Sequence, residues 1–435
     1  MNREQHSDQS PLNGSNSLSP ERTRSALRAV FLTILIDFMG FSVLIPVLPI
    51  WITDQWGATP LQAGGLPIAL YGLSQLLFLP AWGLVSDRIG RRPVILLSLL
   101  GSTLSFCLLA SADSLGMIYV ARILGGFFAA SIGTAQAVVT DLTPPEKRAR
   151  GMGLLGAAFG LGFVLGNALG GLLASLHHMW PALGALAPGI VNERLPFFVV
   201  AALAACNLLF AWKRLPETRP PYKRAWEWRR LFSSFVPVPV RLIAAVHDRR
   251  IGLYLYLFFH FFTAFAALES MCALYLSERF GRGPQAAGLF FAYIGIFIAL
   301  TQGILVGRLA QRFGEARLVV AGLSIMGLSL IGLAAAPSYG WIVAVGPLIA
   351  IGHGIAFPSF TSLYSQACAA EQSGELLGQS QSMGTTGRIA GPAWAGLAMG
   401  KISASAPFTI AGCLFLLGVL LFLSFRRTLL NTTRA

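Results

Sequence analysis

Charged side chains are scarce in this sequence. Only 11% of its 435 residues are Asp, Glu, Lys or Arg, whereas soluble globular chains carry roughly 25%. Hydrophobic residues make up 55% of the chain, and the mean hydropathy is +0.66. This composition excludes an ordinary soluble domain and indicates a protein built mostly of membrane-spanning segments.

Cysteine is also scarce, and clusters of reactive residues are missing. The five cysteines lie singly in or beside apolar stretches, without a CxxC pair or the spacing of a metal site. No nucleophile–base pair, phosphate-binding loop or metal cluster is recognisable in the sequence. We therefore expect no disulfide framework, metal, cofactor or catalytic residue, and an enzyme is the least favoured class of function.

Long apolar segments, by contrast, are abundant. Twelve of them follow one another, each long enough to cross a hydrocarbon core of about 30 Å. They lie at residues 27–51, 63–85, 93–112, 115–138, 151–176, 195–212, 251–276, 286–306, 318–336, 341–363, 376–399 and 408–425. The predicted fold class is an all-α membrane protein with twelve transmembrane helices, and the lipid bilayer is its expected surroundings.

Acidic residues are fewer than basic ones, and the net charge of +14 is unevenly distributed. If the N-terminus is cytoplasmic, the inner segments hold 26 Lys and Arg residues and the outer loops hold 4. Positive residues accumulate on the cytoplasmic side of membrane proteins, so we expect a multi-pass cell-membrane protein (inner membrane in a bacterium) with both termini in the cytoplasm. Basic residues divided among membrane-bounded loops do not form a nucleic-acid-binding surface.

The apolar segments form two groups of six. We expect a disordered cytoplasmic tail at 1–26, a first bundle at 27–212, a linker at 213–250, a second bundle at 251–425 and a C-terminal tail at 426–435. The linker holds ten basic and three acidic residues. Two alternatives stay open for it, a short interfacial helix against anionic lipid and a solvated loop.

The turn between the second and third segments has a distinctive sequence, GLVSDRIGRRPV at 83–94. Its glycines allow two helix ends to approach closely and turn sharply. The pattern resembles the signature loop of the major facilitator superfamily, the alternative being a generic basic loop that only sets topology. The residues that this resemblance assigns to gating are Gly83, Asp87, Arg88, Gly90, Arg91 and Arg92.

An internal repeat agrees with this resemblance. A weaker copy of the turn, GRLAQRFG at 307–314, follows 224 residues later. Gly166-Asn167 and Gly391-Pro392 form a second pair, 225 residues apart. Two matches at nearly one offset indicate two homologous halves. The superfamily has this organisation, and its members bind substrate between the halves near the midplane.

Four ionisable residues are embedded in apolar segments: Asp37, Arg122, Glu269 and Arg388. A charge at membrane depth costs at least about 2.5–3.5 kcal/mol on insertion scales, so we expect each to face a polar interior. Desolvation there favours the neutral acid, whereas a nearby arginine favours the carboxylate. The two acids and two arginines are therefore predicted to serve proton coupling.

Two of these charges lie in motifs with known parallels. Asp37 lies in LIDFMGFSVLIPVLP, which resembles the first helix of tetracycline/proton antiporters. Arg122 opens RILGG, which resembles the R-x-x-x-G motif of the fourth helix, where the arginine is implicated in proton coupling. The alternatives are a static hydrogen-bond anchor for Asp37, an external gate for Glu269 and a structural role for Arg122.

The resemblance also implies a latch between the halves. Asp141 would meet Arg88 across the cytoplasmic face, and Asp87 would engage the start of the eleventh helix. These contacts would form in the outward-open state and break in the inward-open state. The alternative for Asp141 is a helix-capping role.

A glycine-rich run in the fifth segment, GFVLGNALGG, resembles the antiporter motif G-x-x-x-G-P-x-x-G-G, with asparagine in place of the proline. Ser105 likewise stands where tetracycline antiporters have an acid in the third helix. These departures leave transport direction and tetracycline as substrate open. We assign helix packing to Gly162, Gly166, Asn167, Gly170, Gly171, Gly391 and Pro392.

Further polar residues inside the segments are candidates for a substrate cavity. Gln136, Gln302 and His353 are the ones we select, with hydrogen-bonded packing as the alternative. The resemblance implies a monomeric secondary transporter that couples protons to efflux of a drug-like or amphipathic organic molecule. The alternatives are export of an endogenous metabolite or siderophore, uptake by symport, and a transporter-like receptor or scaffold without flux.

Overall fold

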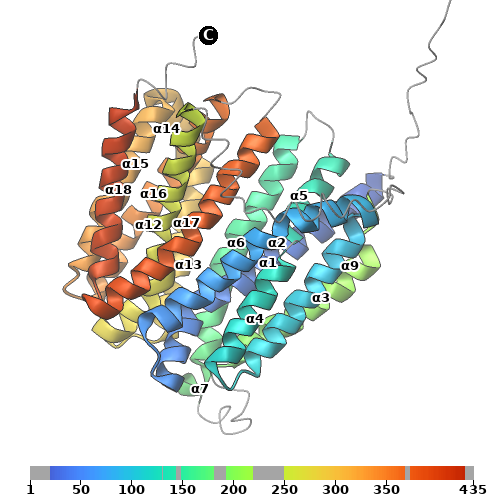
Figure 1. The fold of residues 1–435 in the computed structure, drawn as a ribbon, viewed down its shortest axis with the longest axis horizontal. Coiled ribbons are helices and arrows are strands. Elements are labelled where there is room, and N and C mark those ends of the chain that lie inside the picture. The colour runs from blue at the N-terminus through green and yellow to red at the C-terminus, as the bar shows by residue number, and fades with distance from the viewer. Residues whose placement is uncertain are drawn as a thin grey trace, which may run out of the picture.

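The computed structural model describes residues 20–129, 131–143, 148–180, 193–218, 249–367 and 373–426. Within these ranges the regular elements are helices, arranged as two bundles side by side (Figure 1). The first contains α1 (Pro20–Trp56), η1 (Leu61–Gly65), α2 (Leu66–Ile89), α3 (Arg91–Ala110), α4 (Leu115–Phe128), α5 (Ser131–Leu142), α6 (Arg148–Ala174), α7 (Leu176–Met179) and α9 (Leu195–Arg214). The second contains α12 (Arg249–Phe280), α13 (Pro284–Leu300), η3 (Thr301–Leu305), α14 (Val306–Phe313), α15 (Glu315–Ala334), α16 (Tyr339–Ala367), α17 (Ser373–Lys401) and α18 (Ala406–Ser424).

The first helix begins earlier than its apolar composition predicts. α1 starts at Pro20, inside the stretch assigned to the tail. Proline suits the first turn of a helix because its fixed φ is already helical and its missing N–H is not needed there. The rest of the predicted tails, at 1–19 and 427–435, and most of the linker, at 219–248, lie outside the described residues.

Eleven helical stretches among the described residues are long and apolar enough to cross a membrane. The one remaining predicted segment, the eleventh in chain order, is also helical, as α17, and its 29 residues are sufficient in length. Its composition is too polar for the same hydropathy criterion because glutamines, serines, threonines and Arg388 interrupt it. Such a helix is stable in a bilayer when other helices cover it, and α17 packs against α2 and α12.

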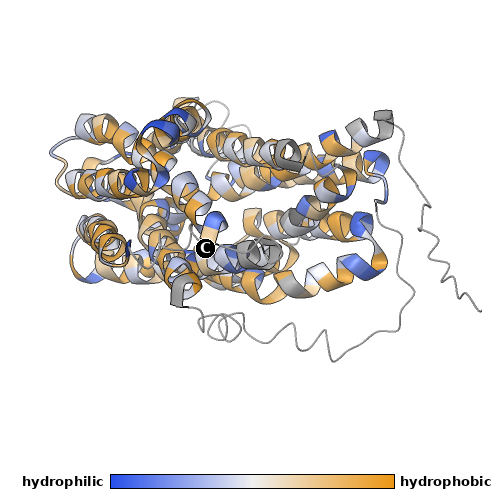
Figure 2. Cartoon of the chain, turned by 90° about the horizontal axis from the view of Figure 1, so that it is seen from above, coloured by the Kyte–Doolittle hydropathy of each residue, from blue (hydrophilic) through white to orange (hydrophobic). Residues whose placement is uncertain are grey.

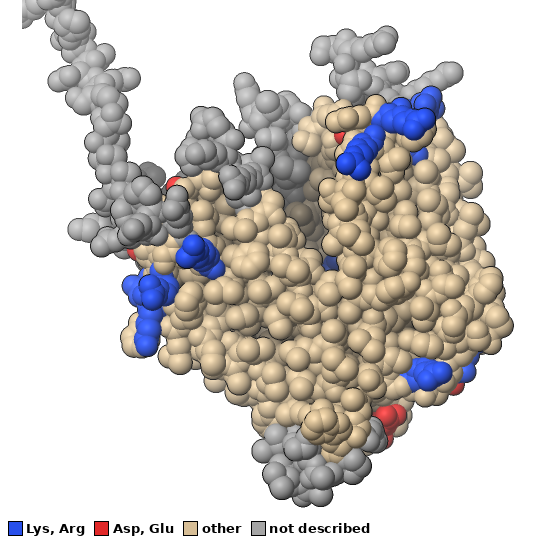
Figure 3. Space-filling view, turned by 180° about the vertical axis from the view of Figure 1, so that it is seen from behind, with Lys and Arg blue, Asp and Glu red and all other residues tan. Residues whose placement is uncertain are grey.

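The surface agrees with a membrane protein. Figure 2 shows hydrophobic residues along most of the helices, and Figure 3 shows a broad uncharged surface between the Lys and Arg side chains of the two ends. We call the end where α1 begins and α2 ends the terminal face, and the end where α1 finishes and η1 begins the far face. Leu328 and Leu420 are more than 60% exposed (63% and 62%), as lipid-facing residues would be.

The internal repeat has a direct structural counterpart. Gly166 on α6 packs against the backbone of Met39 on α1, and Gly391 on α17 packs in the same way against Thr263 on α12. Met39 and Thr263 are themselves 224 residues apart. In both bundles, therefore, a glycine of the fifth helix allows the backbone of the first helix to approach closely.

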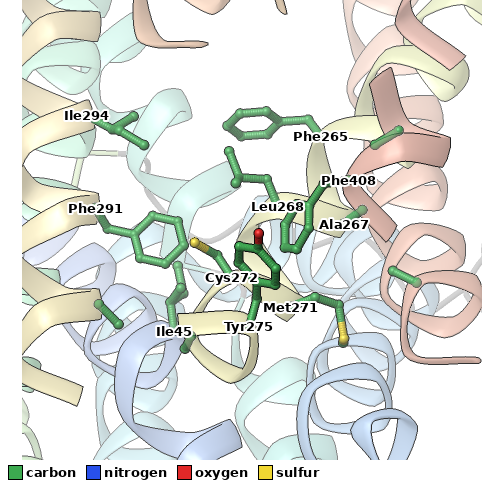
Figure 4. Packing of buried hydrophobic residues seen from close by; sticks show 14 of the residues in the cluster. Ile45, Phe265, Ala267, Leu268, Met271, Cys272, Tyr275, Phe291, Ile294 and Phe408 are labelled. Carbon is green, nitrogen blue, oxygen red and sulfur yellow. The ribbon is translucent and has the colours of Figure 1, made fainter. Parts of the chain in front are cut away.

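The two bundles meet at the far face. A Cβ on Gly65 of η1 would lie 2.8 Å from the Pro392 carbonyl oxygen, and one on Gly171 of α6 would lie 2.5 Å from that of Pro284. Figure 4 shows Ile45 of α1 beside Phe291 and Cys272 of the second bundle, in one buried cluster. Close backbone approach and a shared apolar core therefore seal this end.

Toward the terminal face the same helices lie apart. Gly160, three turns before Gly171 on α6, has no atom within 4 Å of where a Cβ would be. The same holds for Gly303 of η3 and for Gly83 near the end of α2. Figure 3 shows a hollow between the two bundles at this end. Among the described residues, the two bundles are therefore closed against each other at the far face and lie apart at the terminal face.

Candidate functional site

A polar cavity of about 100 Å³ lies where the bundles diverge. Most of its wall belongs to the first bundle, and Arg388 of α17 contributes from the second. The lining residues are Asp37, Phe38, Phe41, Tyr71, Gln75, Ser102, Ser105, Phe106, Arg122, Gly125, Ala129 and Arg388. Aromatic rings thus surround a few polar groups, which is the usual make-up of a small-molecule site.

Arg122 is buried in the wall of this cavity, with only 3% of its surface exposed. Its guanidinium carbon lies 4.7 Å from the centre of the Tyr71 ring, within the range of a cation–π interaction. Its Nη1 atom has no hydrogen-bond partner among the described residues. A buried guanidinium with an unused donor is a strong point of attraction for a carboxylate or another acceptor that enters the cavity.

Arg388 faces the cavity from the second bundle and connects it to the second embedded acid. Its Nη2 atom lies 3.6 Å from Oε1 of Glu269, whose side chain is 8% exposed. The guanidinium also lies 5.0 Å from the centre of the Phe262 ring. Because Arg388 is itself 35% exposed, it can exchange Glu269 for an acceptor in the cavity without moving far.

The structure therefore brings the four embedded charges together. Asp37, Arg122 and Arg388 line one cavity, and Glu269 contacts it through Arg388. They come from four helices, α1, α4, α12 and α17, and the cavity lies between two bundles whose described residues pack together toward the far face. This position allows a bound proton or solute to respond to relative movement of the bundles.

The turn between α2 and α3 is fixed by contacts inside the first bundle. Arg91 pairs with Asp87 at 2.7 Å and with Asp141 of α5 at 3.4 Å, and it donates to Ser86 Oγ at 3.1 Å. Asp141 thus contacts Arg91 in this structure, and its contact with Arg88 in the outward-open state stays a prediction. Arg91 lies at the first position of α3, beside α5 and directly after the Gly90 turn that connects α3 to the last turn of α2, which carries Asp87. It therefore reaches both acids.

The predicted contact of Asp87 with the start of the eleventh helix falls outside the described side chains, which leave out 373–378. With the terminal face open, a latch between the halves is expected to be broken. The repeat places Glu315 where the first bundle has Arg91. Its carboxylate accepts hydrogen bonds from Ser362 at 2.5 Å and Gln366 at 2.7 Å on α16.

A sequence model of the Major Facilitator Superfamily matches residues 30–392 and 273–432 of this chain. The chain belongs to the major facilitator superfamily. It is therefore a multi-pass membrane transporter rather than an enzyme, as its sequence predicted.

Similar proteins within the superfamily include tetracycline-resistance proteins. The class D protein of Salmonella ordonez is 32% identical over 374 residues, covering 85% of this chain and 88% of that one. The class C protein of Escherichia coli is 29% identical over 410 residues, covering 92% and 96%. Among solved structures, the human organic anion transporter MFSD10 (TETRAN) superimposes with a TM-score of 0.66 at 26% identity, covering 92% of this chain and 99% of that one.

The three polar residues selected as cavity candidates do not line the polar cavity described above. Gln136 is half-buried on α5 and Gln302 lies in the π-helical turn η3, and neither lines the polar cavity. His353 of α16 packs among aromatic rings. The centre of its imidazole ring lies 4.6 Å from the ring centre of Phe265 and 5.8 Å from that of Phe357. Its Nδ1 atom is buried without a partner among the described residues.

Sequence reasoning did not select Tyr71, Gln75 and Ser102, which line the cavity. Gln75 lies one helical turn after Tyr71, and Ser102 lies one turn before Ser105, so helical periodicity places each pair on one face. Ser105, which occupies the position of the missing acid, donates to the Ala121 carbonyl at 2.7 Å. Polar side chains repeated on one face of an apolar helix were the signal that could have found them.

Glu217, just after α9, is a second residue that sequence reasoning missed. Its carboxylate accepts the backbone N–H groups of Arg91 at 2.8 Å and Arg92 at 3.2 Å. The first N–H groups of a helix such as α3 have no acceptor within it. Gly90 precedes them with φ +104, and a Cβ there would overlap the Glu217 carboxylate. Both the turn and the approach of Glu217 therefore require glycine at this position.

The substituted antiporter motif lies at the seam between the bundles. Gly162, Gly166 and Gly170 of α6 pack on α1, and Gly171 faces α13. Asn167, in place of the proline, donates from Nδ2 to the Phe163 carbonyl at 2.8 Å, and its backbone carbonyl packs on Gly288. These glycines thus lie where helices touch, and Asn167 retains the backbone N–H that proline would lack.

Proposed function

We propose that this protein couples the export of an amphipathic, drug-like organic molecule to the inward movement of protons, by alternating access. The observation that carries this proposal is the meeting of Asp37, Arg122, Glu269 and Arg388 at one cavity between the bundles. The similarity to tetracycline-resistance proteins supports export as the direction. The proposal places the terminal face and both termini in the cytoplasm of a monomeric cell-membrane protein.

In the proposed cycle, the transported molecule and a proton occupy the site at Asp37 in turn and never together. With the terminal face open, a cytoplasmic molecule enters the cavity and occupies the space beside the Asp37 carboxylate. After the bundles rock, the molecule leaves on the far side and a proton takes its place on Asp37. Protonated Asp37 is neutral, so no charge has to be buried when the cavity closes. The return of the bundles to the state with the open terminal face therefore has a lower barrier. Glu269 and Arg388 form the second, coupled pair.

Replacing Asp37 tests the proposal. In vesicles of known orientation with an imposed pH gradient, Asp37→Asn should reduce pH-driven transport by about tenfold or more, because the amide cannot carry the proton. Asp113→Asn is the matched control, since Asp113 is exposed in the loop before α4. Undiminished coupled transport by a well-folded Asp37→Asn protein would remove Asp37 from the mechanism.

A second candidate is proton-coupled carriage of an organic anion. Two guanidinium groups and one carboxylate line the described cavity wall, and the structurally similar MFSD10 is an organic anion transporter. An anion on Arg122 or Arg388 would withdraw the positive charge that favours ionised Asp37 or Glu269. Anion and proton would then bind together and travel in the same direction.

Proton exchange on binding distinguishes the two candidates. A thermal-shift screen with tetracyclines, cationic dyes, siderophores and aromatic carboxylates first supplies a ligand. The ligand is then mixed with purified protein in weakly buffered solution. Export by exchange predicts proton release, because the ligand excludes the proton from the acids. Cotransport of an anion predicts proton uptake.

A further inference from the structure

A second, smaller cavity adjoins the polar one. Its volume is about 20 Å³. Three residues line both cavities, namely Phe41, Tyr71 and Arg122. The others are Leu44, Ile45, Leu48, Pro49, Ala63, Gly64, Pro67 and Ile68, all without a polar side chain. Apart from Tyr71 and Arg122 its wall is apolar, whereas the polar cavity also has Asp37, Gln75 and Arg388. The two spaces therefore differ in polarity although they share one wall.

Tyr71 forms the centre of that shared wall and is held there by its ring. The ring centre lies 5.8 Å from that of Phe41 and 4.7 Å from the Arg122 guanidinium carbon. Gly126 of α4 packs directly on the Tyr71 carbonyl and fixes the backbone. These aromatic and cation–π contacts act on the ring and do not depend on the hydroxyl. A phenylalanine would therefore make them as well.

The apolar cavity lies on the side of Tyr71 that leads to the far face. Its walls come from the second half of α1 and from η1 with the start of α2. The π-helical turn η1 borders the cavity through Ala63 and Gly64, and a Cβ on Gly64 would lie 2.6 Å from the Ser270 carbonyl oxygen of the second bundle. When the bundles separate at the far face, this contact opens beside the apolar cavity.

Helix α2, which carries Tyr71, also contacts the second bundle. A Cβ on Gly72, the next residue, would lie 2.9 Å from Cγ1 of Ile389 on α17. α2 is thus held by Gly126 of its own bundle on one side and by α17 of the other bundle on another. A rocking movement that removes Ile389 from Gly72 also changes the packing around Tyr71.

We propose that Tyr71 is the gate between the polar cavity and the apolar cavity, and that the apolar cavity is the first part of the path to the far face. The ring closes the passage while the terminal face is open. Displacement of the ring from Phe41 and Arg122 joins the two cavities. An amphipathic solute then places its apolar part where the ring was, so Tyr71 also selects for solutes with such a part.

The gate can be tested by cysteine labelling. The five native cysteines are first replaced by alanine, and Ile68→Cys reports on the apolar cavity while Ser102→Cys reports on the polar one. In oriented proteoliposomes, a membrane-impermeant methanethiosulfonate with a quaternary ammonium group is added from the terminal face. With Tyr71 present, Cys at 68 should react about tenfold or more slowly than Cys at 102, because the gated state is only rarely open.

Variants of Tyr71 supply the decisive comparison. Tyr71→Ala should raise the labelling rate at position 68 about tenfold or more and leave position 102 unchanged. Tyr71→Phe keeps the ring and should behave as the parent protein. Arg122→Gln should give an intermediate rate, since one of the two ring contacts is lost. Unchanged protection at 68 in Tyr71→Ala, or equal rates at 68 and 102 in the parent, overturns the proposal.

The test stays decisive if one variant fails to fold. Labelling at position 102 and a monodisperse elution profile report on folding, and Tyr71→Leu replaces Tyr71→Ala if that variant aggregates. The gate rests on the proposed function only in that a solute crosses through the polar cavity. Labelling needs neither a transported solute nor a pH gradient. Retained coupling in Asp37→Asn would therefore remove Asp37 from the proposed mechanism and leave the gate standing.

Discussion

Single side chains determine the geometry of the turn between α2 and α3. The Glu217 carboxylate supplies to α3 what a capping residue supplies to an isolated helix, since it accepts two N–H groups that have no partner inside the helix. It does so from a residue 126 positions away from Arg91, so it also attaches the end of α9 to this turn. Arg92 reinforces the attachment by donating to the Trp212 carbonyl at 2.6 Å.

Removing this cap should therefore weaken the first bundle. We expect Glu217→Ala to lower the free energy of unfolding by about 1–2 kcal/mol, because two backbone donors lose their acceptor. The measurement is thermal unfolding of the purified protein followed by intrinsic fluorescence. Glu278→Ala is the control, since Glu278 is exposed in the last turn of α12. Equal melting temperatures for both variants would show that solvent replaces the cap without cost.

The functional and structural residues described here differ in whether the sequence alone could predict them. Asp37, Arg122, Glu269 and Arg388 could be predicted because each is an isolated charge in an apolar segment, where lipid would penalise it. Glu217 could not, because an acid between charged and turn-forming residues looks like any solvated one. Its role depends on contacts with a turn far away in the sequence, and no local pattern encodes such contacts.

At the level of helices, α6 and α13 form a seam that is closed toward the far face and open toward the terminal face. Gly288 of α13 packs on the Asn167 carbonyl and on Gly171, whereas Gly160 and Gly303 have no neighbour within 4 Å of where a Cβ would lie. Backbone contact at one end with free glycines at the other is the arrangement expected of two helices that tilt about a point between them.

A methyl group at the closed end should shift this balance. Gly288→Ala would place a Cβ 2.9 Å from the Gly171 Cα, and overpacking of this kind costs about 1–3 kcal/mol. We expect the far-closed state to lose population, which a Gln285→Cys reporter at the seam would register as faster labelling from the far face. Gly332→Ala is the control, because nothing lies within 4 Å of that position. Identical labelling of both variants would contradict the expectation.

The helices themselves were largely predictable, and their irregularities were not. Apolar segments of about 20 residues identify most of the membrane helices without tertiary information, whereas α17 is too polar for that criterion and depends on the helices that cover it. The π-helical turns η1 and η3 could not be predicted, since they change only the hydrogen-bond register of the backbone. η1 nevertheless borders the apolar cavity and touches the second bundle through Gly64 and Gly65.

For the whole molecule, the closed far face and open terminal face describe one of the two states that alternating access requires. The repeat of α1–α6 contacts in α12–α17 shows that each bundle is built alike and internally tight. The contacts between bundles are concentrated near η1, α17 and the α6–α13 seam. Transport by rocking therefore requires those contacts to separate while the contacts inside each bundle persist.

Cross-linking the far face tests that requirement. A Cβ on Gly400 would lie 3.5 Å from Cδ of Pro60, so Pro60→Cys with Gly400→Cys should be joined by a short bifunctional thiol reagent. With a bis-methanethiosulfonate as the reagent, which joins the two thiols through disulfides, counterflow of the screened ligand should then fall to background because the far face can no longer open. It should return when the disulfides are reduced. Gln62→Cys with Tyr119→Cys is the matched control inside the first bundle, where the Tyr119 hydroxyl donates to the Gln62 carbonyl at 3.1 Å. That cross-link should leave counterflow intact, since it spans no moving boundary. Equal counterflow with the two bundles locked together would mean that solute does not cross by separation of the far face.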